Sequence, residues 1–223
     1  NFTAVTSSYA EVYLFKVTEP AGGTVSEVDI SITAPEGGAT PATSATVSTN
    51  GVTAGTVTWT PTVSSTFAYN TAYTASVTLT PNANYTFAST VSVSVNGGTA
   101  VEYTPGSGTL TVTYAFEATG EEPITSVVVT DITTPIAGAE PDTTASVSIG
   151  TAGTVTWTPT VSSTFTYSTA YTAGVTLTAP SGYEFTSGTA VTVNGNAATS
   201  TTLNADGTLT VTYTFDETGA DPN

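Results

Sequence analysis

Apolar and polar residues alternate along short segments of the chain. In segments 110–116 and 209–215 every second residue is Leu, Val, Tyr or Phe, and the residues between them are threonine or alanine. A period of two places the apolar side chains on one face of a β-strand. Threonine suits the opposite face, because it is β-branched and its hydroxyl hydrogen-bonds with water. Apolar residues nowhere recur at spacings of three and four over two helical turns, so the pattern predicts an all-β protein.

The chain contains an internal duplication. Segment 55–80 recurs as segment 153–178, offset by 98 residues and with three differences. The predicted closing strand of each copy, in 108–120 and 207–219, is also nearly the same. Repetition at a fixed period indicates repeated structural units. We therefore predict two domains, at 24–120 and 121–223, preceded by an N-terminal arm at 1–23.

Each repeat divides into short apolar segments separated by turn residues. The separators include Pro-Glu-Gly-Gly, Asn-Gly-Gly and Ala-Asp-Gly, which favour tight turns. About seven or eight strands per repeat, with turns every eight to twelve residues, are typical of an immunoglobulin-like sandwich. The predicted fold class is all-β, with two tandem immunoglobulin-like β-sandwich domains and an N-terminal exchange strand. Trp59 and Trp157 occupy the same position in each repeat, and we expect both in the core.

Motifs of the second repeat carry a family resemblance. They are G-x-V-x-W-T-P at 153–159, F-x-x-x-T-x-Y-T-A-x-V-T-L-T at 165–178, G-Y-x-F at 182–185 and V-N-G at 193–195. This set resembles the immunoglobulin-like repeats of prokaryotic extracellular and cell-surface proteins. The first repeat departs from it, with Asn84 where the second has Gly182. The resemblance implies an exported structural or adhesive module, and it brings no catalytic residues.

Composition excludes several classes of chemistry. The chain has no cysteine, histidine or methionine, its one basic residue is Lys16, and seventeen acidic residues give a formal net charge of −16. Disulfides, histidine-based triads and typical zinc sites therefore lack their side chains. One lysine does not neutralise a run of phosphates, which argues against nucleic acid and against anionic membrane surfaces. A glycosidase needs only two carboxylates, but the acids here lie mainly in turns and linkers, so we predict no enzyme activity.

The sequence also bears on localisation. No apolar run reaches the ~20 residues that span a membrane. The first residue is Asn1 rather than methionine, which we interpret as a mature chain whose export signal has been removed. About a quarter of the chain is threonine, which adds a polar but uncharged surface. We expect an extracellular or cell-surface protein.

The N-terminal arm does not belong to the repeat. Its strand pattern is apolar on both faces, which is typical of a strand buried between two layers, and Gly22-Gly23 lets it swing away. Both repeats already have a full set of predicted strands. We therefore predict that the arm is a donor strand, inserted into a neighbouring copy to build a filament or pilus. The predicted interface residues are Tyr9, Val12, Tyr13, Leu14, Phe15, Lys16 and Val17.

Other interpretations of the arm and of the chain stay open. The arm is also compatible with an extra edge strand on its own first domain. Lys16 is compatible with an isopeptide crosslink to an Asn or Asp. The second function class is a stalk or binding module of an adhesin or S-layer protein, with glycans or host proteins as ligands.

Two sets of surface residues are candidate sites for ions or sugars. Acids cluster at equivalent places after each repeat, and Ca²⁺ binds through carboxylate oxygens, but the spacing matches no calcium loop. The same acids are compatible with a solvated linker, and no other cofactor is predicted. Two asparagines fit the N-glycosylation pattern. The calcium candidates are Glu117, Glu121, Glu122, Asp216, Glu217 and Asp221, and the glycosylation candidates are Asn1 and Asn84.

Overall fold

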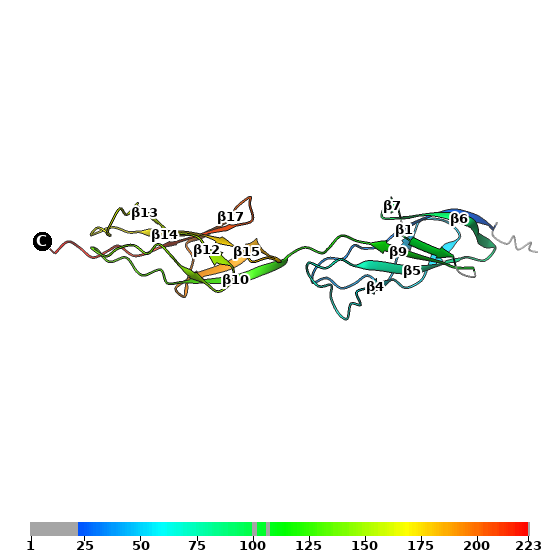
Figure 1. The fold of residues 1–223 in the computed structure, drawn as a ribbon, viewed down its shortest axis with the longest axis horizontal. Coiled ribbons are helices and arrows are strands. Elements are labelled where there is room, and N and C mark those ends of the chain that lie inside the picture. Colours follow the sequence, from blue (N-terminus) through cyan, green and yellow to red (C-terminus); the bar gives the residue numbers. More distant parts are fainter. Residues whose placement is uncertain (1–21, 100–101, 106–107, 223) are drawn as a thin grey trace, which may run out of the picture. The chain divides into compact units, whose positions relative to one another are not determined.

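The computed structural model describes residues 22–99, 102–105 and 108–222. These residues form eighteen strands and no helix (Figure 1). The all-β prediction is therefore confirmed for the part of the chain that the structure describes. Among these residues no helix is long and apolar enough to cross a membrane.

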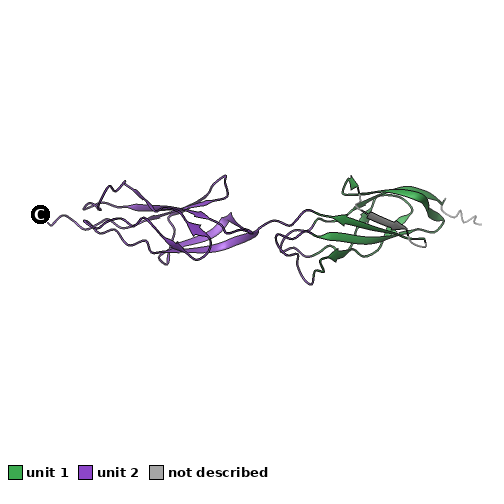
Figure 2. Ribbon diagram, viewed as in Figure 1, with its two compact units in different colours: residues 1–34, 41–63, 73–116 green, residues 35–40, 64–72, 117–223 purple. Residues whose placement is uncertain are grey.

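Contacts divide the chain into two compact units (Figure 2). The described residues within 1–34, 41–63 and 73–116 form unit 1, and those within 35–40, 64–72 and 117–223 form unit 2. The sequence predicts a boundary at 120/121, and the division places two loops of the first repeat, 35–40 and 64–72, in unit 2. The predicted domain boundaries therefore remain a prediction.

The strands of unit 1 form two sheets, with orders β2-β1-β6-β7 and β3-β5-β9-β8, and β4 pairs with β5 off this path. Their bounds are β1 Gly23–Ser31, β2 Thr46–Val47, β3 Val52–Ala54, β4 Thr58–Thr60, β5 Thr74–Pro81, β6 Tyr85–Val95, β7 Gly98–Thr99, β8 Glu102–Pro105 and β9 Leu110–Ala115.

The strands of unit 2 repeat this arrangement, with orders β11-β10-β15-β16 and β12-β14-β18-β17, and β13 pairs with β14. Their bounds are β10 Glu122–Thr130, β11 Ser146–Val147, β12 Thr151–Ala152, β13 Thr156–Thr158, β14 Thr172–Thr178, β15 Tyr183–Val193, β16 Asn196–Ala197, β17 Ser200–Leu203 and β18 Leu209–Thr214.

The first strand of each half pairs in parallel with the sixth. β10 runs parallel to β15, and the register shifts between Ile124 and Ser126. At this irregularity the buried Thr189 donates its hydroxyl to Ile124 O (2.7 Å). β1 and β6 pair in the same way. Because the sheets of an immunoglobulin-type sandwich are antiparallel, this parallel pair is a local difference from the predicted pattern.

The two sheets of unit 2 face each other across one hydrophobic core. Val127 and Val129 of β10 and Val193 of β15 belong to the same cluster as Leu177 of β14 and Leu209 of β18. All are nearly inaccessible to solvent. The intervening threonines lie on the other face, as the alternation predicts. There, for example, the hydroxyls of Thr172 and Thr214 hydrogen-bond at 2.9 Å.

Both tryptophans are buried, as predicted. Trp157 donates its indole N–H to Asp142 O (2.8 Å), and its ring lies 4.9 Å from that of Phe165 and 5.8 Å from that of Phe215. Trp59 makes the equivalent bond to Ala42 O (2.8 Å). Buried indoles usually satisfy the N–H in this way, so the tryptophan joins a loop to the core in each repeat.

The Asn-Gly turn after β6 also fixes the end of β1. Asn96 and Gly97 both have positive φ, of 53° and 80°, as a two-residue hairpin turn requires. The Asn96 side chain accepts from Ile32 N (3.0 Å) and donates to Ile32 O (2.8 Å). Asn194 has the same conformation and also donates to Ile132 O. Asn96 therefore forms the turn and holds the backbone that follows β1 through two side-chain hydrogen bonds.

Candidate functional site

The predicted donor residues lie outside the described residues. This applies to Tyr9, Val12, Tyr13, Leu14, Phe15, Lys16 and Val17, and also to the glycosylation candidate Asn1. Asn84 is described. It is exposed and has a φ of 66° in the turn between β5 and β6, and an acceptor asparagine needs such a surface position.

The acidic calcium candidates are all exposed. Three follow β9 or begin β10, and three follow β18. In the described part of the chain, no group of three or more acidic side chains is placed to hold a metal ion. Calcium binding thus remains a prediction without a ligand cluster. The candidates are Glu117, Glu121, Glu122, Asp216, Glu217 and Asp221.

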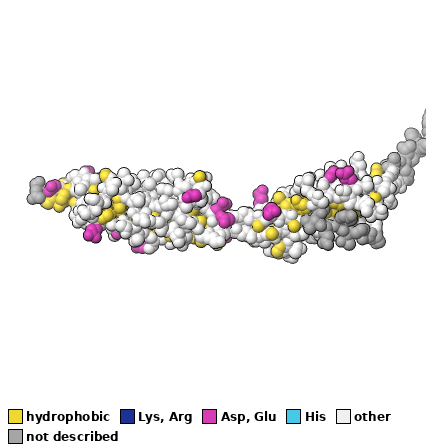
Figure 3. Space-filling model, turned by 45° about the horizontal axis from the view of Figure 1, so that its top comes forward, with side chains coloured by type: hydrophobic (Ala, Val, Ile, Leu, Met, Phe, Trp, Pro, Cys, Tyr) yellow, Lys and Arg dark blue, Asp and Glu magenta, His cyan; other side chains and the backbone are white. Residues whose placement is uncertain are grey.

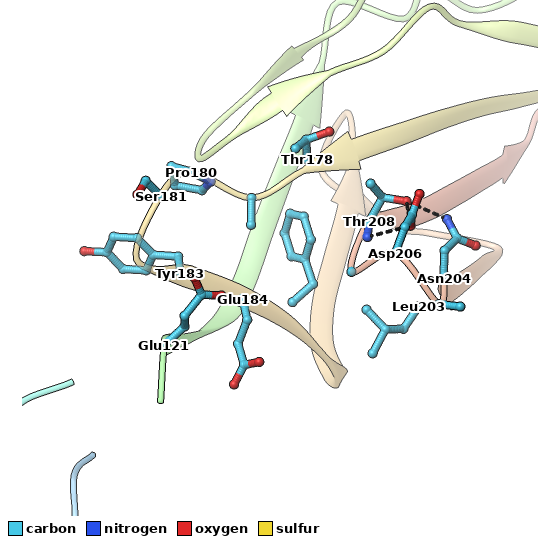
Figure 4. Close-up of a pocket in the computed structure, with 14 residues that line it drawn as sticks. Glu121, Thr178, Pro180, Ser181, Tyr183, Glu184, Leu203, Asn204, Asp206 and Thr208 are labelled. Carbon is cyan, nitrogen blue, oxygen red and sulfur yellow. Dashed lines mark hydrogen bonds between the residues drawn. The ribbon is translucent and has the colours of Figure 1, made fainter. Parts of the chain in front are cut away.

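A groove in unit 2 collects polar and apolar side chains from separate segments (Figure 4). Its volume is about 430 Å³. One wall is the turn before β15 and the first residues of that strand, and the other is the end of β17 with the following turn. We call this the β15–β17 groove. Its lining includes Glu121, Tyr183, Glu184, Leu203 and Asp206.

Two tight turns shape the groove. In the first, Tyr183 N donates to Pro180 O (3.1 Å), and Gly182 has a φ of 85° that side chains rarely adopt. In the second, Gly207 N donates to Asn204 O (3.0 Å) and Asn204 N to Thr208 O (2.8 Å). These turns hold Tyr183 and the Asn204–Thr208 segment at opposite sides of the groove (Figure 4).

Asp206 is held by its own turn. Its Oδ1 accepts from the Thr208 hydroxyl (2.7 Å) and from Thr208 N (3.1 Å). These two hydrogen bonds, the side-chain bond above all, favour the charged carboxylate and lower the pKa of Asp206 from its ordinary value.

The lowered pKa gives a test of this turn. We expect Thr208→Val to raise the pKa of Asp206 toward 3.8, because both the hydroxyl donor and the turn geometry are weakened. Carboxyl ¹³C NMR titration measures it. Since the folded-state pKa lies below the unfolded one, the carboxylate contributes stability above the unfolded pKa, and this contribution disappears as the pH falls through the folded pKa. An unchanged Asp206 titration in the variant would contradict the assignment.

The groove combines negative charge with exposed apolar surface. Tyr183 is 37% and Leu203 41% exposed, among the most exposed large apolar residues described. Beside them stand Glu121, Glu184 and Asp206, while Phe185 is buried at the base. Most of the described surface visible in Figure 3 is neither acidic nor apolar. An anionic, partly apolar groove suits a ligand that carries both a cation and apolar side chains.

The equivalent positions of the first repeat lack this chemistry. Gly22 precedes β1 where Glu121 precedes β10, and Thr86 follows Tyr85 where Glu184 follows Tyr183. Segment 106–109 reads Gly-Ser-Gly-Thr in the sequence and has no counterpart of Asp206. The groove's charge is therefore specific to the second repeat.

Sequence reasoning identified only Glu121 of these residues, and for calcium. Glu184, Asp206, Tyr183 and Leu203 were missed, since they lie far apart in the chain. The available signal was the comparison of repeats, because the second repeat has acids at positions where the first has none.

Comparison with known proteins gives no match. No family model, no curated protein and no solved structure matches the chain. The resemblance to prokaryotic immunoglobulin-like repeats therefore rests on the motifs alone, and any function must be argued from the residues.

Proposed function

We propose that this chain is the structural subunit of an extracellular filament or pilus, made of two immunoglobulin-like sandwiches. Subunits assemble head to tail when the N-terminal strand of one inserts into its neighbour. The mechanism is assembly rather than catalysis.

The observation that carries the proposal is an unprotected sheet edge in unit 2. β17 ends its sheet, and all four of its residues, Ser200–Leu203, are exposed. Among the described strands none pairs with its outer side. An edge strand offers free N–H and C=O groups, and natural proteins usually block such edges with charge, proline or a covering segment.

The sequence of the corresponding strand in the first repeat includes a charged residue and a proline. β8 reads Glu-Tyr-Thr-Pro, whereas β17 reads Ser-Thr-Thr-Leu with no charge and no proline. Proline cannot donate to an added strand, and a charged side chain resists burial in one. The difference favours strand addition at β17 over β8. With β17 as the acceptor edge, a donor arm from each chain gives a head-to-tail contact and an open polymer.

The second candidate is a binding module on an adhesin stalk. The exposed Tyr183, with the carboxylates of Glu121 and Glu184 beside it, favours it, since aromatic faces with nearby polar groups occur in ligand sites. Such a module would bind its ligand without self-association.

Deletion of residues 1–20 tests the proposal. We expect the deletion to abolish polymers and to leave folded monomers, because it removes the donor strand but none of the described strands. Electron microscopy and sedimentation velocity measure assembly, and circular dichroism measures folding. As the control, a chain with residues 9–17 replaced by Gly and Ser keeps the arm's length and should also be monomeric. Polymers of normal length after deletion would refute donor exchange.

A further inference from the structure

We propose that the β15–β17 groove of unit 2 is the acceptor site for residues 9–17 of a second copy of the chain. The segment adds as a strand to the outer edge of β17, and Lys16 lies beside the groove's carboxylates. This inference rests on the proposed function and specifies its interface.

Backbone pairing is available on both sides of the groove. The outer side of β17 has no partner among the described strands. Opposite it, β16 pairs only with Thr192 and Val193 of β15. The part of β15 before Thr192 pairs with β10 on one side. On its other side this part has no partner among the described strands. A strand that enters here gains main-chain hydrogen bonds from β17 and fills the space beside β15.

The length of the donor segment fits this edge. Residues 9–17 span about 30 Å when extended, at about 3.4 Å per residue, and the four residues of β17 span about 14 Å. The segment therefore pairs along the whole of β17 and continues past its end into the groove.

Charge complementarity identifies the occupant. Lys16 is the one basic side chain of the entire sequence, and the groove presents three carboxylates, from Glu121, Glu184 and Asp206. The Thr208 hydroxyl donates to Asp206 Oδ1 and holds this carboxylate at the groove. Complementary charges across an interface set register and suppress wrong partners. A second copy of this chain supplies the cation.

Apolar complementarity points to the same segment. With a period of two, Lys16 shares a strand face with Leu14 and Val12. When this face is turned into the groove, Leu14 lies near the exposed Leu203. Tyr13 and Phe15 lie on the opposite face of the added strand, which points away from the groove.

Cysteine pairing between copies tests the site directly. The chain has no cysteine, so Leu14→Cys and Leu203→Cys chains can be mixed without background. We expect a disulfide-linked dimer of one chain of each kind, because a disulfide requires Cα atoms within about 7 Å. The matched control pairs Leu14→Cys with Thr86→Cys, the first-repeat position equivalent to Glu184, and should form little product.

The mapped product decides between trans and cis insertion. Peptide mapping that shows residue 14 joined to residue 203 in a mixed dimer supports the proposal. No such product, or the same yield with Thr86→Cys, overturns it. A chain that carries both cysteines and closes its disulfide as a monomer at high dilution overturns it too, since the arm would then occupy its own groove.

Charge reversal tests the role of Lys16. We expect Lys16→Glu and Glu184→Lys each to raise the critical concentration for assembly about tenfold, and the combined variant to recover most of the loss. Thr86→Lys is the control for added positive charge and should assemble normally. The effects should shrink at 1 M salt, where the Debye length is about 3 Å. A combined variant no better than the single ones overturns the pairing of Lys16 with Glu184.

These tests fail separately from the proposed function. If the deletion of residues 1–20 abolishes polymers but residue 14 does not crosslink to residue 203, donor exchange stands and the acceptor groove is refuted. If the deletion leaves polymers intact, both are refuted.

Discussion

Replacing Trp157 with alanine is expected to destabilise unit 2 by about 3–5 kcal/mol, the usual cost of truncating a large buried aromatic residue. The side chain is 8% exposed and contacts the rings of Phe165 and Phe215. The substitution also leaves Asp142 O without its indole donor. Differential scanning calorimetry measures the fall in Tm of unit 2. Each kcal/mol of lost stability lowers the Tm of a domain of roughly this size by about 4–8 °C.

The chain offers a matched control for this substitution. Trp157→Phe keeps most of the apolar contact and removes the N–H, so it should cost about 1–3 kcal/mol. Trp59 remains as a fluorescence reporter of the first repeat, and its transition should not move. If Trp157→Ala shifted both transitions equally, or neither, the assignment of Trp157 to the core of unit 2 would be wrong.

Replacing Asn96 with alanine is expected to cost unit 1 about 2–4 kcal/mol. The change removes both hydrogen bonds to the backbone of the buried Ile32, and an unsatisfied buried group costs about 1–3 kcal/mol. Alanine also tolerates the left-handed φ of 53° less well than asparagine, whose polar side chain hydrogen-bonds locally. Urea unfolding of the full chain measures the sum.

Two further variants separate these terms. Asn96→Gly tolerates the positive φ but loses the two hydrogen bonds to Ile32. Its free energy of unfolding should therefore be about 1 kcal/mol higher than that of Asn96→Ala. Asn96→Asp keeps the acceptor for Ile32 N and loses the donor to Ile32 O. Equal stability of the Asn96→Gly and wild-type chains would show that the asparagine acts only as a turn residue and that its hydrogen bonds to Ile32 add nothing.

The all-β class and the core faces were predictable because they depend on local alternation. Leu110 and Val112 alternate with threonine and are buried, as their spacing requires. The tryptophans were predictable because a duplicated large apolar residue in a strand has few places other than the core. The parallel pairing of β10 with β15 was not predictable, because it joins segments about sixty residues apart, and alternation carries no information about which strands become neighbours.

The candidate groove shows the same limit. Glu121, Glu184 and Asp206 are ordinary turn and strand-end acids in the sequence. They become one surface because two turns and the start of β15 converge beside the end of β17. The hydrogen bonds from Thr208 that lower the pKa of Asp206 are local, and an Asp-Gly-Thr turn could have suggested them.

The sequence alone determined the duplication, the strand period, the uncharged threonine faces and the presence of one cation in the whole chain, since each is a property of residue type and order. Tertiary structure decided which strands pair, which strands end a sheet and which acids line one groove. Those outcomes depend on contacts between segments distant in the chain, where packing of the two sheets, rather than local preference, selects the arrangement. The start of β15 and the end of β17 line one groove only in the folded chain. Lys16 gained a candidate partner from that juxtaposition.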